Sequence, residues 1–579
     1  MRQAALLAVL LAPSGALAHI ILPGTQPFEA GASFAPNSSC DPCHSDYDDA
    51  GDYEAGDGAR GSSMSHAARN PLFRAALASA EADSPGIGDF CLRCHAPAAF
   101  LEGRAVVPDG SLLRETDRGV DCSFCHRMVD GDPEGPYVAN GMFFVDDAAV
   151  YGGPFDDALD TGHAVGASTY LSDPKACAVC HDQSSVLHGM RDPKGDVIYA
   201  QFPNDRTWSE WEASDFAAEE TTCQDCHMPE VPGRAASDPD APDRTVHRHE
   251  WNAADVLSAD LLPLTDTLAP EVVDALEMGR TRARESLRSA ATLEVRTGEV
   301  AAGEDEVEVV VRVTNEAGHK LPTGFADGRR MWLDVTVADS AGTELFRSGR
   351  YDADADDIVF DRNIRTYEAR HGIAFIGPSF RTALNDMVVE DTRIPPRGYE
   401  PEDGRIDLLP FGRVYGVGDA AVNQDDAGYD LQVPCGVRGP LTVTARLLYQ
   451  RASPAYVQHL AGTGGDRGAA LLDAWEATGR GAPAEMLSVE EAVEVVACPE
   501  PPFDPWDGIG PAERRDGGAE TPHVDVPGPS PVRVNRMPAG GCSCHLVDSG
   551  AGSAFGFCAW LLLLRGRTTR GRECVPSRR

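Results

Sequence analysis

The chain has 579 residues, with 91 Asp and Glu against 50 Lys and Arg, which gives a formal net charge of −41. Binding to nucleic acid or to membrane surfaces needs clustered basic residues, so this acidic balance argues against both kinds of partner. The length predicts several domains, and the charge favours protein partners with basic docking surfaces.

Residues 1–18 have the pattern of a secretory signal peptide. Arg2 supplies the positive end, Ala4 to Ala12 is apolar, and Ala16-Leu17-Ala18 supplies the cleavage pattern. The alternative is a buried N-terminal helix. Export predicts an oxidising compartment, and cleavage would leave His19 at the new N-terminus.

Five Cys-x-x-Cys-His motifs follow in residues 19–262. In each motif, two thiols can form thioether bonds to one haem, and the adjacent His can coordinate its iron. A zinc site needs cysteine pairs matched into four-ligand sets, and neither zinc nor a redox disulfide requires a His after every pair. We therefore expect five covalently bound haem c groups. The cysteines are Cys40, Cys43, Cys91, Cys94, Cys122, Cys125, Cys177, Cys180, Cys223 and Cys226, and the histidines are His44, His95, His126, His181 and His227.

The density of these motifs predicts how residues 19–262 fold. Roughly 40 residues per haem are too few to enclose each cofactor in a core of its own. The haems must therefore pack against one another, with the chain wrapped around them. We expect a mostly helical and irregular pentahaem cytochrome c domain, with one recognisable helix at Ala67–Ala80.

The second axial ligand of each iron decides between electron transfer and catalysis. An iron with two axial ligands carries electrons, whereas an iron with an open face can bind a small molecule. The favoured second ligands are His66, His163, His247, His249 and His319. His188 is a weaker candidate because it follows His181 so closely, and His371 reads as structural. The sequence nominates no catalytic residue.

The second half of the chain changes character. Residues 263–290 predict a connecting helix, strongest over Pro270–Ala290, and residues 291–498 predict an antiparallel β-sandwich with helical insertions near Pro454–Thr478. Cys435 and Cys498 are expected to form a structural disulfide. The fold class is thus α+β with several domains. The expected strands are Thr292–Arg296, Glu306–Thr314, Met331–Ala338 and Leu441–Tyr449.

The C-terminus has the composition of a linker followed by a tag. Residues 499–540 are rich in Pro and Gly, and residues 541–579 contain Cys542-Ser543-Cys544, the apolar run Ser553–Leu564 and a group of Arg residues. The apolar run is shorter than the roughly 20 residues that span a bilayer. This order resembles the MYXO-CTERM sorting tag of myxobacterial surface proteins, which implies processing near the Cys pair and attachment at the outer cell surface. Retention as an ordinary tail is the alternative.

Several segments between Pro36 and Cys498 resemble the cytochrome c-554 and hydroxylamine oxidoreductase superfamily. Some members of that superfamily reduce nitrite or oxidise hydroxylamine, and others only carry electrons. Its pentahaem nitrite reductases usually replace one motif His with Lys, whereas all five positions here are His. Its hydroxylamine oxidoreductases have more haems and a Tyr cross-linked to the catalytic haem, and the sequence nominates no such Tyr here. The resembling segments are Met64–Phe73, Gly88–His95, Asp121–Val129, Cys223–Pro229, Gly318–Gly324 and Asp391–Gly398.

The expected function is electron transfer through five haems, in respiration or to acceptors outside the cell. The alternative is a haem oxidoreductase acting on a small nitrogen or sulfur compound at one open iron. A third possibility is a binding module in which the β-sandwich docks a partner. We expect redox proteins as partners, a location in the cell envelope, at the outer membrane surface or outside the cell, and membrane contact only through the C-terminal tag.

Overall fold

The computed structural model describes residues 20–48, 53–131, 139–160, 162–251, 253–298, 300–303, 307–417, 421–496 and 498. The described residues belong to one compact unit. The predicted signal peptide, His19, the Pro- and Gly-rich linker and the predicted C-terminal tag lie outside the described residues. Among those that are described, no helix has the length and apolar character needed to cross a membrane.

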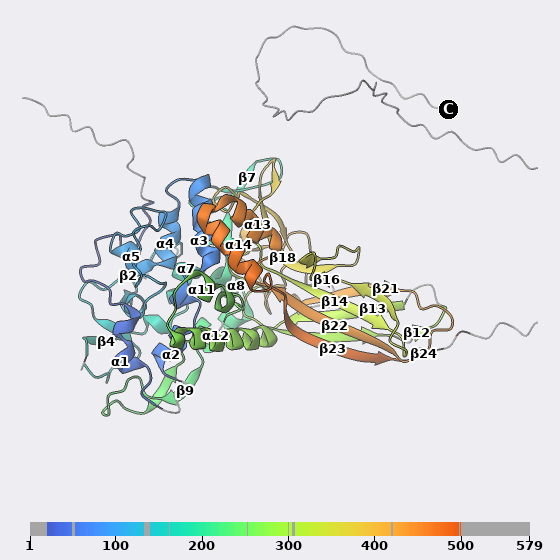
Figure 1. Cartoon of the computed structure of the whole chain (residues 1–579), viewed down its shortest axis with the longest axis horizontal. Coiled ribbons are helices and arrows are strands. Elements are labelled where there is room, and N and C mark those ends of the chain that lie inside the picture. Colours follow the sequence, from blue (N-terminus) through green and yellow to red (C-terminus); the bar gives the residue numbers. More distant parts are fainter. Residues whose placement is uncertain are drawn as a thin grey trace, which may run out of the picture. The chain divides into compact units, whose positions relative to one another are not determined.

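Residues 20–262, which we call the Cys-rich region, consist of short elements joined by long irregular segments (Figure 1). The helices are α1 (Asp41–His44), α2 (Ala55–Arg60), α3 (Pro71–Asp83), α4 (Gly88–His95), α5 (Pro97–Leu101), α6 (Cys122–Cys125), α7 (Lys175–His181), α8 (Thr207–Glu212), α9 (Asp215–Ala218), α10 (Cys223–His227) and α11 (Ser258–Thr265, which ends just beyond this region). The strands are β1 (Met128–Val129), β2 (Phe144–Val145), β3 (Tyr151–Gly153), β4 (Val165–Ala167), β5 (Gln183–Ser184), β6 (Met190–Arg191), β7 (Val197–Tyr199), β8 (Pro203–Asp205), β9 (Glu230–Gly233) and β10 (Arg244–His247).

The helix expected at Ala67–Ala80 is present as α3 but begins later. Asn70 caps it by accepting a hydrogen bond from the Leu72 amide at 3.0 Å, and Pro71 occupies its first position. These are the residues that favour a helix start, because the side chain satisfies a free amide and Pro has none to satisfy. The preceding Met64–His66 forms a 3₁₀ turn instead.

Helix α12 (Pro270–Ser289) joins the two halves and matches the expected connecting helix. Its buried residues, Val272, Ala275, Leu276, Ala283 and Leu287, recur at helical spacing along one face. The predicted helix at Pro270–Ala290 is confirmed to within one residue.

Residues 291–498, which we call the β-region, contain two main sheets. One has the order β11-β13-β21, and the other has the order β19-β18-β14-β22-β23, with β15 paired to β14 and β20 paired to β18. Both are antiparallel, and all four strands expected from the sequence are confirmed. The bounds are β11 (Ala291–Thr297), β12 (Val300–Ala301), β13 (Val307–Asn315), β14 (Arg330–Ala338), β15 (Glu344–Ser348), β16 (Tyr351–Asp352), β17 (Asp357–Ile358), β18 (Arg365–Ile373), β19 (Gly377–Pro378), β20 (Met387–Asp391), β21 (Gln424–Leu431), β22 (Leu441–Gln450), β23 (Ala484–Val493) and β24 (Val495–Val496).

The two sheets share one hydrophobic core. Val311 on β13 lies opposite Val295 and Ala427 in the first sheet, and it packs in the same core as Leu333 and Leu447 of the second sheet. Strands β13 and β21 alternate buried and more exposed side chains, as a sheet with one covered face requires.

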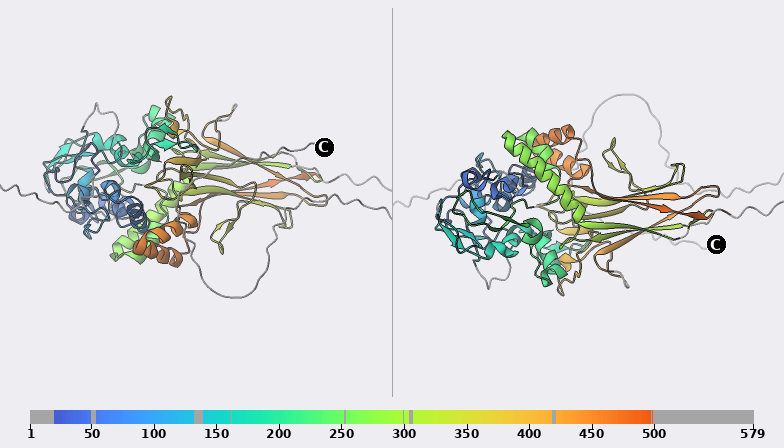
Figure 2. Two further views of the ribbon diagram at one scale, coloured as in Figure 1. Left: turned by 90° about the horizontal axis from the view of Figure 1, so that it is seen from above. Right: turned by 90° about the horizontal axis from the view of Figure 1, so that it is seen from below.

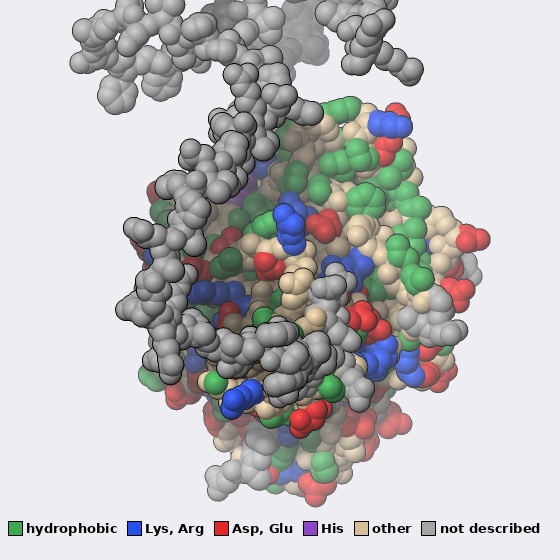
Figure 3. Space-filling view, turned by 90° about the vertical axis from the view of Figure 1, so that its right-hand side faces the viewer, with side chains coloured by type: hydrophobic (Ala, Val, Ile, Leu, Met, Phe, Trp, Pro, Cys, Tyr) green, Lys and Arg blue, Asp and Glu red, His purple; other side chains and the backbone are tan. Residues whose placement is uncertain are grey.

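Cys435 and Cys498 form the expected disulfide. Figure 3 views the described surface from the right-hand side of Figure 1, where acidic side chains gather along the lower edge and apolar ones at the upper right.

The helical insertions predicted near Pro454–Thr478 are confirmed as α13 (Pro454–Thr463) and α14 (Gly465–Ala477). They pack on α3 and α11 of the Cys-rich region, where Leu72, Leu261, Val457 and Trp475 belong to one buried cluster. Figures 1 and 2 show these orange helices beside the helical half of the unit, away from the long strands. The β-region thus contacts the Cys-rich region through helices inserted between its strands.

Candidate functional site

Each Cys-x-x-Cys-His motif lies on a short helix or at its end. Helices α1, α4, α7 and α10 end at the motif His, and His126 follows α6 directly. Residues three apart on a helix lie on the same face. The helical conformation therefore turns both thiols of a motif toward one side, where two bonds to one group can form.

The ten motif cysteines are free thiols, in contrast to the disulfide-bonded Cys435 and Cys498. Burial raises the pKa of Cys91 and of Cys125 to about 12, whereas a hydrogen bond to a neighbouring thiol lowers the pKa of Cys40 and of Cys223. Among the described residues, no three His, Cys, Asp or Glu side chains converge on a point that a metal ion would occupy.

The motifs lie against one another, but not in the order of the sequence. The thiol of Cys40 in the first motif is a hydrogen-bond partner of Cys122 in the third. Likewise Cys94 of the second motif meets Cys180 of the fourth. The same holds for Cys177 of the fourth motif and Cys223 of the fifth.

One electrostatic interaction links the first pair of motifs to the rest. Cys125 of the third motif lies within electrostatic range of Cys177 and Cys180 in the fourth. The attachment points of all five motifs therefore form one continuous cluster, with the fourth motif at its centre.

Three motif histidines each face a second histidine from a distant part of the chain. The ring centres are 6.3 Å apart for His44 and His163, 6.1 Å for His126 and His249, and 6.3 Å for His227 and His319. The ring planes of each pair lie within 27° of parallel. Two imidazoles bound to opposite sides of one metal, with metal–nitrogen bonds of about 2 Å, have ring centres about 6 Å apart. The separations therefore fit one iron between each pair.

Backbone carbonyls fix the ring orientation of most of these histidines. The Nδ1 atoms of His44, His126 and His249 lie 2.8, 2.7 and 2.9 Å from the carbonyl oxygens of Ala235, Gly152 and His247. The Nδ1 atoms of His163 and His319 have similar partners at 3.4 and 3.1 Å. A carbonyl only accepts, so Nδ1 carries the proton and Nε2 keeps its lone pair for a metal.

Burial also favours the neutral form of four of these rings, and the neutral form is the one that binds a metal. Burial lowers the pKa of His249 to about 4, and it lowers the pKa values of His44, His126 and His319. For His249 the neighbouring His126 adds to the effect.

The second and fourth motifs have a different arrangement. His95 has the same kind of backbone partner, with Nδ1 3.3 Å from the Ala67 carbonyl, and its ring stacks on Phe73 at 3.8 Å. Within the described chain, neither His95 nor His181 faces a second imidazole ring. The Nε2 atom of His188, soon after His181, is buried without a hydrogen-bond partner.

Two of the favoured second ligands lie outside these pairs. His66 is buried, with Nε2 2.8 Å from the Arg60 carbonyl and Nδ1 beside Arg69, so both ring nitrogens already have partners. His247 has Nδ1 2.8 Å from the Met228 carbonyl and Nε2 3.8 Å from Glu230.

His371, interpreted as structural, lies on β18 away from the motifs. Its Nδ1 is 3.2 Å from an Asp327 oxygen, and its ring packs against Phe202. His163, His249 and His319 are therefore the predicted second ligands that the structure brings to a motif histidine.

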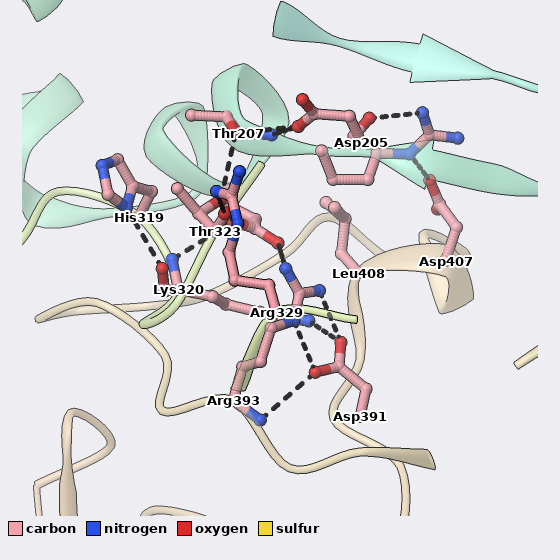
Figure 4. Close-up of polar contacts among 12 residues, drawn as sticks. Asp205, Thr207, His319, Lys320, Thr323, Arg329, Asp391, Arg393, Asp407 and Leu408 are labelled. Atoms are coloured by element: carbon pink, nitrogen blue, oxygen red, sulfur yellow. Dashed lines mark hydrogen bonds and ion pairs between the residues drawn. The ribbon is translucent and has the colours of Figure 1, made fainter. Parts of the chain in front are cut away.

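Sequence reasoning missed the residues that surround His319. Glu210 on α8, Lys320, Asp391 and Arg393 form a buried polar network near it. Figure 4 shows Lys320, Asp391 and Arg393 below His319. The signal was present in part, because Lys320, Asp391 and Arg393 lie in two of the segments that carry the family resemblance. Nothing in the sequence showed that those segments meet.

The donor set fits haem c. Free thiols in pairs on one helical face and an adjacent His are present in each motif, and three motifs add a second His at the required separation.

No protein-family model matches the chain, and no curated protein matches it. Among solved structures, it is similar to a penta-heme cytochrome c552 from Thermochromatium tepidum. The identity is 18%, the TM-score is 0.42, and the match covers 70% of this chain and 83% of that chain. At this TM-score and identity, the likeness is too distant to indicate a function for the chain.

Proposed function

We propose that the protein is an exported pentahaem c-type cytochrome that carries electrons. The observation that carries this proposal is the set of three histidine pairs, each with ring centres 6.1 to 6.3 Å apart and each containing a motif histidine. The ten motif cysteines would hold five haems, and His44, His95, His126, His181 and His227 would bind their irons.

Haem c supplies reversible one-electron chemistry at its iron when bound. The protein's part is to hold the group rigidly and to fill the axial positions. His163, His249 and His319 would do so on the second face at three motifs, which excludes small molecules from those irons. Carbonyl partners at Nδ1 would keep these ligands in one tautomer and one orientation.

The contacts between motifs support electron transfer rather than five isolated sites. Attachment points that meet at Cys40 and Cys122, at Cys94 and Cys180, and at Cys177 and Cys223 would bring the bound groups close together. The first, second and fifth motifs are the ends of this cluster. They are the natural places for electrons to enter and leave.

The superfamily, the cellular location and the partners of the protein are also part of the proposal. The sequence segments favour the cytochrome c-554 and hydroxylamine oxidoreductase superfamily. The signal peptide and the MYXO-CTERM-like tag favour display on the outer cell surface. The net charge of −41 favours redox partners with basic docking surfaces.

A second candidate function is a haem oxidoreductase acting on a small nitrogen or sulfur compound. It is favoured by the second and fourth motifs, where His95 and His181 face no second imidazole among the described residues. His188 is the candidate to close one of these positions, since its buried Nε2 has no partner.

Spectroscopy of the full chain, matured in a host that attaches c-type haem, tests both functions. We expect five haems per chain, low-spin EPR signals from the ferric protein, and no carbon monoxide binding by the reduced protein. One high-spin haem that binds carbon monoxide would instead favour the oxidoreductase. A chain that takes up no haem would refute both.

A pair of variants tests the histidine assignments. His249→Ala should convert one haem from low-spin to high-spin. His371→Ala is the matched control, because His371 is also buried but pairs with Asp327. It should leave the spectrum unchanged.

A further inference from the structure

The histidine opposite the fifth motif comes from the β-region. His319 lies just after β13, on a loop that ends at Gly324, and this loop rests on helices α8 and α9 of the Cys-rich region. A Cβ atom on Gly318 would lie 3.3 Å from ring carbons of Trp211 and Phe216, so the glycine permits this close approach. The fifth motif, Cys223–His227, follows α9 directly.

The backbone of the loop is held by one buried side chain. Asn315, at the end of β13, donates through Nδ2 to the carbonyl oxygens of His319, Ile394 and Pro395 at 2.8, 2.9 and 3.0 Å. Leu321 and Ile394 exchange backbone hydrogen bonds across the same gap. The loop is thereby fixed against the segment that follows β20.

Two buried basic side chains bind one carboxylate beneath the loop. Lys320 is fully buried, and its Nζ lies 2.8 Å from Asp391. Arg393 binds both oxygens of Asp391, at 2.8 and 2.7 Å. Burial alone would raise the pKa of Asp391, but Arg393 and Lys320 outweigh it and hold that pKa well below its usual value.

Glu210 on α8 joins this cluster to the Cys-rich region. It is completely buried, and its Oε1 lies 3.0 Å from Arg393. Its Oε2 accepts hydrogen bonds from the Lys320 amide at 3.2 Å and from the Thr323 hydroxyl at 2.6 Å. The Glu210 carboxylate therefore holds both sides of the loop that carries His319.

Helix α8 also holds the residue beside another motif histidine. Asp182, which follows His181, is buried and pairs with Arg206 at 3.0 Å and with the Ser209 hydroxyl. Arg206 in turn reaches Asp407 of the β-region at 2.8 Å. The same helix is thus anchored next to the fourth motif and under the ligand of the fifth.

Stability alone does not account for this network. Desolvating buried ion pairs costs about as much as their attraction returns, and apolar replacements are often equally stable. What such a network adds is a single defined geometry. Here that geometry fixes the position of one imidazole.

We propose that Glu210, Lys320 and Asp391 are positioning residues that hold His319 opposite His227, so that the β-region supplies and fixes the second axial ligand of the fifth haem. This inference rests on the proposed function. It assigns the β-region a part in cofactor ligation instead of partner docking.

The test compares three variants of the full, haem-loaded chain. His319→Ala removes the ligand, and Lys320→Met combined with Asp391→Asn removes one positive and one negative buried charge while Arg393 keeps Glu210 as partner. The control is Arg312→Met combined with Asp426→Asn, an ion pair of 2.6 Å at the surface of the same β-region. Each is measured by ferric EPR, by carbon monoxide binding to the ferrous form and by thermal unfolding.

We expect His319→Ala to convert one haem of the five to a high-spin form that binds carbon monoxide. The Lys320 and Asp391 double variant should convert the same haem in a fraction of the molecules, and the control should convert none. A double variant that lowers the melting temperature yet keeps every haem low-spin would show a merely structural network and overturn the proposal. So would a His319→Ala spectrum identical to that of the unaltered chain.

These outcomes differ from failure of the proposed function. If the unaltered chain carries five low-spin haems while the variants behave as the control does, electron transfer stands and only the positioning role is lost. If the unaltered chain binds no haem, the proposed function itself fails.

Discussion

The Cys-rich region and the β-region are stabilised in different ways. The longer strands of the β-region have seven to ten residues and surround one continuous hydrophobic core that includes Val311, Leu333 and Leu447. In the Cys-rich region most helices have four to eight residues, and many strands have two. Its largest core cluster is built around Leu92, Phe100 and Phe124, beside the cysteines of the motifs.

This difference indicates which region the proposed haems would stabilise. A segment with short elements and little periodicity buries too little apolar surface to offset its conformational entropy. Haems held at five motifs would supply the missing apolar contacts. The β-region has its own core and a disulfide and does not require them.

The largest effect that tests this comparison is loss of haem attachment. In cells that lack c-type haem maturation, we expect residues 20–262 of the full chain to become sensitive to protease while a fragment containing residues 291–498 persists. Limited proteolysis followed by mass spectrometry measures this. Equal resistance of both regions without haem would contradict it.

The next effect concerns the buried charges between the two regions. Asp391→Asn should lower the free energy of unfolding by about 3–5 kcal/mol, the usual cost of breaking a buried ion pair. Because the folded pKa of Asp391 is depressed, its contribution is present above the unfolded value of about 3.9 and is lost as the pH falls through the lower folded value.

The difference between the Asp391→Asn chain and the unaltered chain should therefore be constant from neutral pH to about pH 5 and shrink below about pH 4. Denaturant unfolding at several pH values measures it. Asp426→Asn, in an exposed pair, is the control and should cost at most about 1 kcal/mol. A difference in unfolding free energy that grows as the pH falls would contradict the predicted pH dependence.

A cavity in the β-region core should lower the stability of the protein without changing its haem spectrum. Leu333 is fully buried, so Leu333→Ala should cost about 2–5 kcal/mol of unfolding free energy. The haem spectrum should not change, because the shared core of the two sheets is distinct from the cluster around the motifs. Loss of a low-spin signal in this variant would mean that the two regions are coupled through the core.

The smallest effect is expected at the disulfide. Replacing Cys435 and Cys498 together by Ser should cost about 2–4 kcal/mol, because the bond closes a long loop in the unfolded chain. Haem content should stay at its original value, since neither residue belongs to a motif. A drop in haem content would assign this pair to the cofactor site.

The two regions also differed in how far they could be predicted. Period-two alternation placed β11, β13, β14 and β22 to within one or two residues, and Pro270 together with helical spacing placed α12. In the Cys-rich region, α3 began four residues later than expected because Asn70 and Pro71 favour a helix start there. The short elements around the motifs followed from no periodicity at all.

The sequence by itself determined the five Cys-x-x-Cys-His motifs and predicted their chemistry, since two cysteines and a histidine at fixed spacing act within one helical turn. It also predicted four long strands of the β-region, the insertion helices and the cysteine pair, because each depends on local pattern or on elimination. Tertiary structure alone decided which second histidine meets which motif. His163, His249 and His319 reach their partners from distant segments, and the contact of His319 depends on Glu210, Lys320 and Asp391. Such contacts depend on how whole elements pack, and no local spacing encodes them.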